Sequence, residues 1–233
     1  MIFNDRRDAG RHLAAALKHH LHPEETMVVL GIPRGGVVVA AEVAGALGAE
    51  LDVVIARKIR APDQPELGIG AVVDGAHITI LNDELVRLVG ASREDLDREI
   101  ALQSEEIDRR LLMYRGKRPA VDISGQTAIV IDDGIATGYT FRAALEGLRQ
   151  GNPRRLIAAA PVAAADSARM LRSFADQVVC LNIPEAFMAV GYWYRDFQQV
   201  SDEEVVDILR RFWSRPKRNP EVPPSKEKAG WGP

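Results

Sequence analysis

Two adjacent carboxylates lie in the segment of this chain that offers the most chemistry. Asp132 and Asp133 follow the apolar run 128–131, and a turn containing glycine and threonine, 134–140, comes directly after them. The apolar run is typical of a parallel strand buried on both faces, so these polar residues fall at its carboxyl end, where open α/β sheets bind ligands. Paired carboxylates at such an edge suit sugar hydroxyls or a hydrated divalent cation, which takes oxygen ligands.

The turn after the acid pair favours a phosphate. Gly134 and Gly138 allow the backbone to bend tightly, and Thr137 and Thr140 carry hydroxyl donors. Apolar residues then recur at helical spacing over 141–148. Because the free N–H groups at a helix start attract anions, the segment predicts a site for an anionic, sugar-bearing ligand. The alternative is an ordinary strand-turn-helix whose acid pair is solvated or caps the helix.

A second strand-to-helix turn has a similar character. The expected strand 27–30 runs into GIPRGG, residues 31–36, and then into a helix of small residues, 37–47. Three glycines and an arginine at such a turn can cradle an anion. Taken alone, the segment is equally well explained by simple turn chemistry.

Two cations close the next expected strand. Residues 51–56, which contain the apolar run 53–56, are expected to form a strand that ends in Arg57 and Lys58. Positive charge at a strand's carboxyl edge could neutralise an anionic leaving group. Solvated surface charges are the alternative.

The segment VIDDGIATGYT, residues 130–140, resembles the signature of the type I phosphoribosyltransferases that binds 5-phosphoribosyl 1-diphosphate (PRPP). In that signature, two acidic residues precede a 5′-phosphate loop ending in T-G-x-T. The end of the turn 31–36 is similar to the family's pyrophosphate loop, and the family carries a basic residue near 57–58, ahead of a mobile lid. The resemblance covers most of residues 24–200.

The resemblance implies transfer of ribose 5-phosphate from PRPP to a ring nitrogen of a small heterocyclic base, with release of pyrophosphate and a requirement for Mg²⁺. The implied catalytic residues are Asp132, Asp133, Arg34 and Lys58. The acid pair would bind the ribose hydroxyls and metal, directly or through water, and Arg34 and Lys58 would stabilise the pyrophosphate. The implied substrate-binding residues are Ile135, Ala136, Thr137, Gly138, Tyr139 and Thr140 for the 5′-phosphate, and Gly35, Gly36 and Arg57 for the pyrophosphate.

Aromatic residues crowd the segment FMAVGYWYRDF, residues 187–197, in a chain that is only 6% aromatic. Aromatic faces can stack on a base, and Tyr192 and Asp196 look like the base-binding hood of the hypoxanthine-guanine enzymes. Core packing is the alternative for this segment, and it is the favoured explanation for Trp193 and Phe197 taken individually. Those enzymes carry an Asp immediately before the T-G of the phosphate loop, where this chain has Ala136. The orotate and adenine enzymes also have a non-acidic residue near that point, so the base stays unidentified.

Strands alternating with helices predict an α/β fold, with a mostly parallel sheet flanked by helices. The resemblance adds a five-stranded core, a small hood and a flexible lid loop. One domain would span 1–213, with the lid and a helical insertion at about 59–118 and the hood at about 183–200 plus the N-terminal segment. The lid would include the Pro- and Gly-bearing stretch 59–70. The Pro-rich, polar tail 214–233 is expected to be disordered.

Further elements follow from local patterns. Residues 71–73 and 77–81 are expected to pair as a hairpin. Ser92 and Asp95 predict a capping box at the start of a long amphipathic helix, whose apolar stripe could also be a homodimer interface. Three histidines near residue 20 lack spaced partner ligands, so a solvated cluster is expected there rather than a metal site.

Composition limits the class of protein. The chain has 233 residues, 46% of them hydrophobic, which is enough for one sizeable core. A formal net charge of −3 argues against a nucleic-acid partner. The single cysteine, Cys180, excludes a disulfide framework. No signal peptide or membrane-spanning pattern is visible, so we expect a cytoplasmic protein without a membrane partner.

Two other functions are compatible with these motifs. A PRPP-binding regulator or sensor would keep the phosphate loop and perform no transfer. A protein that binds nucleoside triphosphates, with Asp132 on Mg²⁺ and the glycines on the phosphates, is less favoured, because the pattern G-x-x-x-x-G-K-[ST] is absent.

Overall fold

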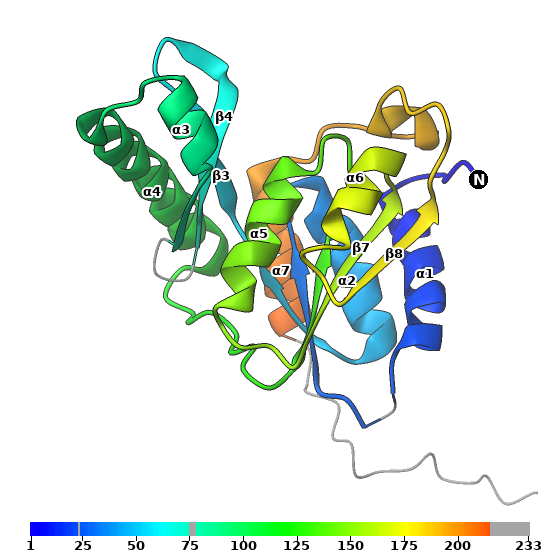
Figure 1. The fold of residues 1–233 in the computed structure, drawn as a ribbon. Coiled ribbons are helices and arrows are strands. Elements are labelled where there is room, and N and C mark those ends of the chain that lie inside the picture. The colour runs from blue at the N-terminus through cyan, green and yellow to red at the C-terminus, as the bar shows by residue number, and fades with distance from the viewer. Residues whose placement is uncertain (23, 75–77, 215–233) are drawn as a thin grey trace, which may run out of the picture.

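A five-stranded parallel sheet forms the centre of the molecule (Figure 1). The computed structural model describes residues 1–22, 24–74 and 78–214. Every neighbouring pair in the central sheet is parallel, as predicted. The strands, in spatial order, are β2 (Glu50–Val53), β1 (Met27–Gly31), β6 (Thr127–Ile131), β7 (Arg155–Val162) and β8 (Gln177–Asn182).

Helices cover both faces of this sheet, which accounts for its unbroken apolar strands. One core joins Val29 and Ile129 to a helix layer; a second joins Val28 and Val130 to the opposite layer. The first layer contains α1 (Arg6–Leu17), which continues as η1 (Lys18–His20), with α2 (Gly35–Leu47) and α7 (Asp202–Trp213). The second contains α5 (Tyr139–Arg149) and α6 (Ala165–Leu171).

A smaller antiparallel sheet lies to one side of the central sheet (Figure 1). Its strands are β3 (Ala56–Ala61), β4 (Gln64–Val73) and β5 (Ile78–Leu81), followed by α3 (Asp83–Leu88) and α4 (Arg93–Arg115). Arg115 at the end of α4 binds Asp52 of β2 at 2.8 Å and Asp74 at 3.1 Å. This largely buried ion triad connects the α4 insertion to the edge of the central sheet.

The structure corrects two predictions in this region. The strand expected over 51–56 ends at Val53, and Arg57 and Lys58 lie instead on β3 of the second sheet. The apolar run concealed this break because Val54 and Ile55 are buried where the chain crosses between the sheets. The stretch 59–70, expected as a loop, is the hairpin of β3 and β4. Its ladder is irregular from Ile59 to Ala61, and an irregular ladder tolerates a proline such as Pro65.

Several local predictions are confirmed. β4 pairs with β5 with Val73 opposite Ile78, and Ser92 and Asp95 form a capping box at the start of α4. The helix α3, of only 6 residues, was not predicted from the sequence. Within the described part of the chain, no helix has the length and apolar character needed to cross a membrane. The predicted disordered tail spans residues 214–233. Of these, the structure describes only Ser214, so the prediction lies outside the described residues.

The short hood helix η2 (Val190–Trp193) and the chain leading to α7 complete the fold. Phe3 of the N-terminal segment forms a parallel bridge with Tyr194 of the hood. Phe3 and Tyr194 belong to a small apolar cluster separate from the two main cores. The N-terminal segment therefore packs with the hood, although the two lie at opposite ends of the sequence.

Candidate functional site

The two predicted anion-binding turns meet because β1 and β6 are neighbours in the sheet. Gly31 lies opposite Ile131 in the parallel register, so the turns that follow these residues leave the sheet side by side. A Cβ atom on Gly36 would lie 2.6 Å from the Ile131 carbonyl oxygen and 2.8 Å from the Asp132 Cα. Only glycine permits this close approach of the two backbones.

The turn before α2 presents free backbone donors. Among the described residues, no hydrogen-bond partner is found for the amides of Arg34, Gly35 and Gly36. These amides stand at the start of α2, where the helix dipole also favours an anion. The Pro33–Arg34 peptide is cis. The geometry is that of an anion cradle next to the acid pair.

The turn after β6 divides into an anchor and an open loop. The amide of Ile135 donates to the Val162 carbonyl at 2.9 Å and its side chain is buried, so Ile135 fastens the loop to β7 and its amide is not free to bind a phosphate. Ser167 of α6 donates to the Ala136 carbonyl at 2.5 Å. Within the described part of the chain, no partner is found for the amides of residues 136–140. Thr137 and Thr140 are exposed, as a phosphate-binding loop requires.

The two residues of the acid pair, Asp132 and Asp133, lie in different environments. Asp132 is only partly exposed, and its carboxylate accepts a hydrogen bond from the Asp133 amide at 2.8 Å. Burial, and secondly the adjacent Asp133 charge, raise the pKa of Asp132 well above the ordinary carboxyl value. Asp133 is instead paired with Arg6, whose Nε donates to its carboxylate at 2.7 Å.

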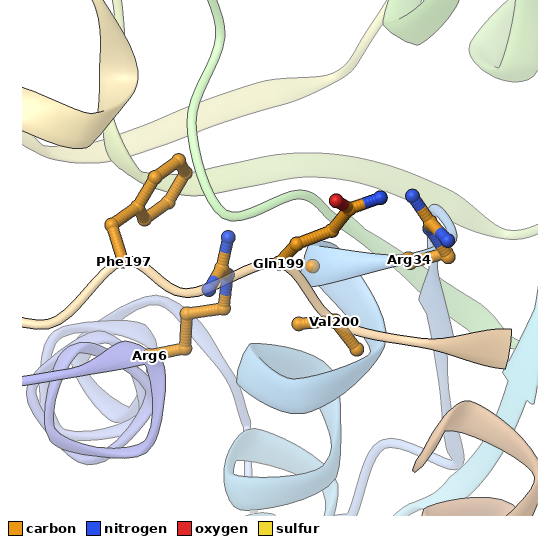
Figure 2. Close-up of a pocket in the computed structure, with 6 residues that line it drawn as sticks. Arg6, Arg34, Phe197, Gln199 and Val200 are labelled. Atoms are coloured by element: carbon orange, nitrogen blue, oxygen red, sulfur yellow. The ribbon is translucent and has the colours of Figure 1, made fainter. Parts of the chain in front are cut away.

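Arg6 is the residue that brings α1 into the site. Its side chain is 11% exposed and that of Asp133 is 15% exposed, so water screens this ion pair only weakly. The same guanidinium donates to the Gln198 carbonyl at 2.7 Å and lies 3.9 Å above the Phe197 ring. Figure 2 shows Arg6 beside Phe197, with its guanidinium directed toward the pocket.

Tyr194 holds the backbone of the same acidic residue. Its hydroxyl donates to the Asp133 carbonyl at 2.5 Å, and its ring packs against Phe3 and Phe197 at centroid distances of 5.6 Å and 5.0 Å. Burial, and secondly the charge of Asp133, raise the pKa of the Tyr194 hydroxyl, so it remains a neutral donor. No local sequence pattern indicated that Arg6 or Tyr194 would contact Asp133, because both reach it from distant segments.

A cavity of about 340 Å³ opens next to Arg6 and the turn before α2 (Figure 2). Two guanidinium groups and the Gln199 amide give it donors without any carboxylate in its lining. The lining residues are Arg6, Arg34, Gly35, Phe197, Gln199 and Val200. The cavity could admit an anionic group that approaches the acid pair from the hood side.

Four predicted residues lie elsewhere in this conformation. Lys58 donates to the Glu66 carbonyl at 2.8 Å within the second sheet, and Arg57 donates to Gln103 of α4 at 2.9 Å. Burial, and secondly the nearby Arg110 charge, lower the pKa of Arg57.

In the hood, Tyr192 is 69% exposed, and Asp196 is exposed, with its carboxylate accepting from the Gln198 amide at 3.3 Å. No hydrogen bond or ion pair joins any of these four side chains to the acid pair among the described residues. Their roles in binding stay predictions.

The acid pair is chemically suited to Mg²⁺. Magnesium is usually held by one or two carboxylates together with substrate phosphates and water. Asp132 and Asp133 supply two carboxylates between two anion cradles. No group of three histidine, cysteine or acidic side chains that could hold a metal occurs in the part of the chain that the structure describes. The two carboxylates fit Mg²⁺, with its remaining oxygen ligands supplied by substrate phosphates and water.

Comparisons with known proteins agree with this geometry. A family model described as a phosphoribosyl transferase domain matches residues 3–195. The chain is 42% identical over 210 residues to Mycobacterium tuberculosis Rv0571c, a protein named as an inferred phosphoribosyl transferase. That alignment covers 90% of this chain and 47% of the relative, so the chain spans about half the length of the curated relatives it matches.

A solved structure is similar over almost its whole length. The crystal structure of TT1426 from Thermus thermophilus matches with a TM-score of 0.82 and 44% identity. The match covers 91% of this chain and 99% of the other.

Proposed function

Because this chain belongs to the phosphoribosyl transferase family, we propose that it transfers ribose 5-phosphate from PRPP to a nitrogenous base and releases pyrophosphate. The observation that carries the proposal is the meeting of two amide-lined turns at the acid pair, since PRPP carries a phosphate at one end and a diphosphate at the other. A single anion cradle would suit many ligands. Two cradles separated by carboxylates suit a doubly phosphorylated sugar.

The reaction breaks the bond between the anomeric carbon and the diphosphate oxygen and forms a bond from that carbon to a ring nitrogen, which gives up its proton to the pyrophosphate or to solvent. The sugar becomes more positive as the bond breaks, and the diphosphate gains negative charge. The carboxylates of Asp132 and Asp133 would stabilise the positive sugar and orient its hydroxyls. Arg34 and the amides of Gly35 and Gly36 would hold the departing pyrophosphate.

The 5′-phosphate would be bound by the loop 136–140. Its amides and the hydroxyls of Thr137 and Thr140 supply donors, and Gly138 and Tyr139 lead into α5. Ile135 has an anchoring role here, which differs from the direct phosphate contact first expected. Binding at this end fixes the sugar relative to the acid pair, and such positioning is itself a large part of catalysis.

Mg²⁺ would neutralise part of the diphosphate charge when bound, with Asp132 and Asp133 as its protein ligands, directly or through water. Arg57 or Lys58 could add positive charge only if the second sheet moved toward the acid pair. The proposal treats residues 1–213 as the catalytic unit, which would act in the cytoplasm on small molecules. It leaves the base open, because Ala136 removes the carboxylate that the hypoxanthine-guanine enzymes carry there.

The test is a pyrophosphate-release assay with PRPP, Mg²⁺ and a panel of purines, pyrimidines and other nitrogen heterocycles. We expect release with at least one base, and we expect Asp133→Asn to abolish it while the folded circular dichroism spectrum persists. Full turnover by a folded Asp133→Asn variant would refute the role of that carboxylate. PRPP binding without release for any base would instead support a sensor, and failure to bind PRPP would exclude both functions.

A further inference from the structure

We propose that Arg6 is a positioning residue: it holds the Asp133 carboxylate over the turn before α2, so that the N-terminal segment and hood set the geometry of the acid pair. The inference rests on the proposed function, since it assigns a part in PRPP binding to a residue outside every motif in the sequence. Two sets of contacts support this role: those that fix the backbone near Arg6 and those that hold its guanidinium.

The backbone of Arg6 is fixed before its side chain reaches the site. The amide of Phe3 donates to the Trp193 carbonyl at 2.9 Å, and the amide of Arg195 donates back to the Phe3 carbonyl at 2.9 Å. Asp5 then caps α1 by accepting a hydrogen bond from the Asp8 amide at 2.7 Å. The hood and the helix cap therefore hold the start of α1 in one place.

The guanidinium is held by three groups of different kinds. Asp133 and the Gln198 carbonyl accept its hydrogen bonds, both at 2.7 Å, and the Phe197 ring supports its flat face. Only an arginine offers several donors in one plane together with a face that stacks. A lysine could satisfy Asp133 or Gln198, but not both along with the ring.

The carboxylate of Asp133 is confined between Arg6 and the turn. A Cβ on Gly35 would lie 1.8 Å from the Asp133 Oδ2 atom and 2.8 Å from the Arg6 Nε atom. The ion pair thus packs directly on the backbone that is expected to hold pyrophosphate. Without Arg6, this carboxylate would be free to rotate away from the like charge of Asp132.

Tyr194 also fixes Asp133, because its hydroxyl donates a hydrogen bond to the Asp133 carbonyl. Side chain and backbone of Asp133 are therefore both fixed from the N-terminal segment and the hood. A group that acts on a carboxylate in this way need not touch the substrate. Removal of the Arg6 guanidinium should therefore weaken PRPP binding only when the Asp133 carboxylate is present.

The experiment is a calorimetric titration of the full chain with PRPP in the presence of Mg²⁺. The variants are Arg6→Gln, Arg6→Lys, Asp133→Asn and the double variant Arg6→Gln/Asp133→Asn. Arg7→Gln is the matched control, because Arg7 occupies the next position of α1, is 50% exposed and pairs with Glu42 at 3.2 Å. Circular dichroism and thermal unfolding establish that each variant is folded.

We expect Arg6→Gln to weaken PRPP binding by about 10- to 30-fold, the effect of losing one or two charge-assisted hydrogen bonds. Arg6→Lys should fall between this variant and the wild type, and Arg7→Gln should stay within about twofold of the wild type. The double variant should bind no more weakly than Asp133→Asn alone, because Arg6 acts through that carboxylate. A merely structural arginine would give additive losses.

Two results would overturn the inference while leaving the proposed function in place. One is PRPP binding by Arg6→Gln that is as tight as that of the wild type or tighter. Equal affinity would mean that Arg6 has no part in binding, and higher affinity would mean that the substrate must displace Arg6. The other is additive losses in the double variant. If Arg6→Gln does not fold, Arg6→Lys provides the same comparison with Asp133→Asn.

If the wild type itself does not bind PRPP, the proposed function fails, and the positioning of Asp133 by Arg6 is tested through protein stability. In that case urea unfolding of the wild type, Arg6→Gln, Asp133→Asn and the double variant should still show coupling between the two positions, and additive changes in the free energy of unfolding would refute the positioning role of Arg6.

Discussion

Adding one methyl group at Gly35 should displace the Asp133 carboxylate without disturbing the backbone of the site. The ideal Cβ position lies 1.8 Å from Asp133 Oδ2 and 2.5 Å from its Cγ, far inside van der Waals contact. The atoms in the way belong to side chains, including the Nε of Arg6 at 2.8 Å. In Gly35→Ala, the carboxylate can therefore rotate away, but only by giving up its ion pair with Arg6.

The expected cost follows from these contacts. Crowding a packed site by one methyl group costs about 1–3 kcal/mol, and breaking a partly buried ion pair adds to it. The higher helix propensity of alanine offsets at most about 1 kcal/mol, and less at the first residue of α2. We therefore expect Gly35→Ala to lower the free energy of unfolding by about 1–3 kcal/mol.

A double-mutant cycle in urea unfolding isolates the clash. In an Asp133→Ala background, the obstructing carboxylate is gone, so Gly35→Ala should cost at least about 1 kcal/mol less than in the wild type. Gly36→Ala is the matched control, because its Cβ would meet backbone atoms, the Ile131 carbonyl oxygen at 2.6 Å and the Asp132 Cα at 2.8 Å. Its cost should be the same in both backgrounds within about 0.5 kcal/mol.

An equal cost of Gly35→Ala with and without the Asp133 carboxylate would refute the predicted clash. PRPP binding by Gly35→Ala that matches the wild type would also count against it, since the displaced carboxylate would then have no part in binding. A folded Gly35→Ala protein with weakened PRPP binding and a reduced cost in the Asp133→Ala background is the expected combination.

Three further predictions concern single contacts. Burial raises the pKa of Asp74 from 3.8 to about 6, so the folded state keeps a proton that the unfolded chain loses. The free energy of unfolding should therefore fall by about 2 kcal/mol as pH rises from 4 to 6. Asp74→Asn should flatten this dependence in urea unfolding; an unchanged slope would mean that Arg115 compensates the charge. Tyr194→Phe should lower the free energy of unfolding by about 1–3 kcal/mol, because it leaves the partly buried Asp133 carbonyl without its donor, and it should weaken PRPP binding in the calorimetric titration. Unchanged stability would mean that water replaces the hydroxyl. Ser201→Ala removes the side-chain oxygen that accepts from the Glu204 amide at the start of α7 and should cost about 1 kcal/mol by the same measurement, whereas no loss would show that the cap is dispensable.

The central sheet and both anion-binding turns could be predicted from sequence because their signals are local. Apolar runs identify strands buried on both faces, and glycines followed by helical periodicity identify the turns. The order of strands around β1 and β6 then brings the two turns together. The same signals failed at Val53, because an apolar run that crosses from one sheet to another has the same composition as a strand that continues.

The partners of Asp133 could not be predicted in this way. Arg6 lies 127 positions away along the chain and Tyr194 lies 61 positions away. Whether an arginine in the first turn of a helix is solvated or buried against a carboxylate depends on how the N-terminal segment packs on the hood. That packing depends on Phe3, a single aromatic residue without a recognisable pattern around it.

The aromatic residues of the hood could stack on a base or pack around the groups that contact Asp133, and the composition of the segment does not distinguish these two roles. Their density predicted flat faces available to a base, yet Tyr194 and Phe197 stack on each other at 5.0 Å and Arg6 covers the Phe197 ring. These rings are therefore occupied in holding the groups that contact Asp133. Any base stacked in this conformation would have to use a more exposed face, such as that of Tyr192. On the prediction that Tyr192 stacks on the base, recognition of the base would be separate from the residues that set the geometry of the acid pair. Substitution of Tyr192 should then alter base preference in the pyrophosphate-release assay without altering the affinity for PRPP.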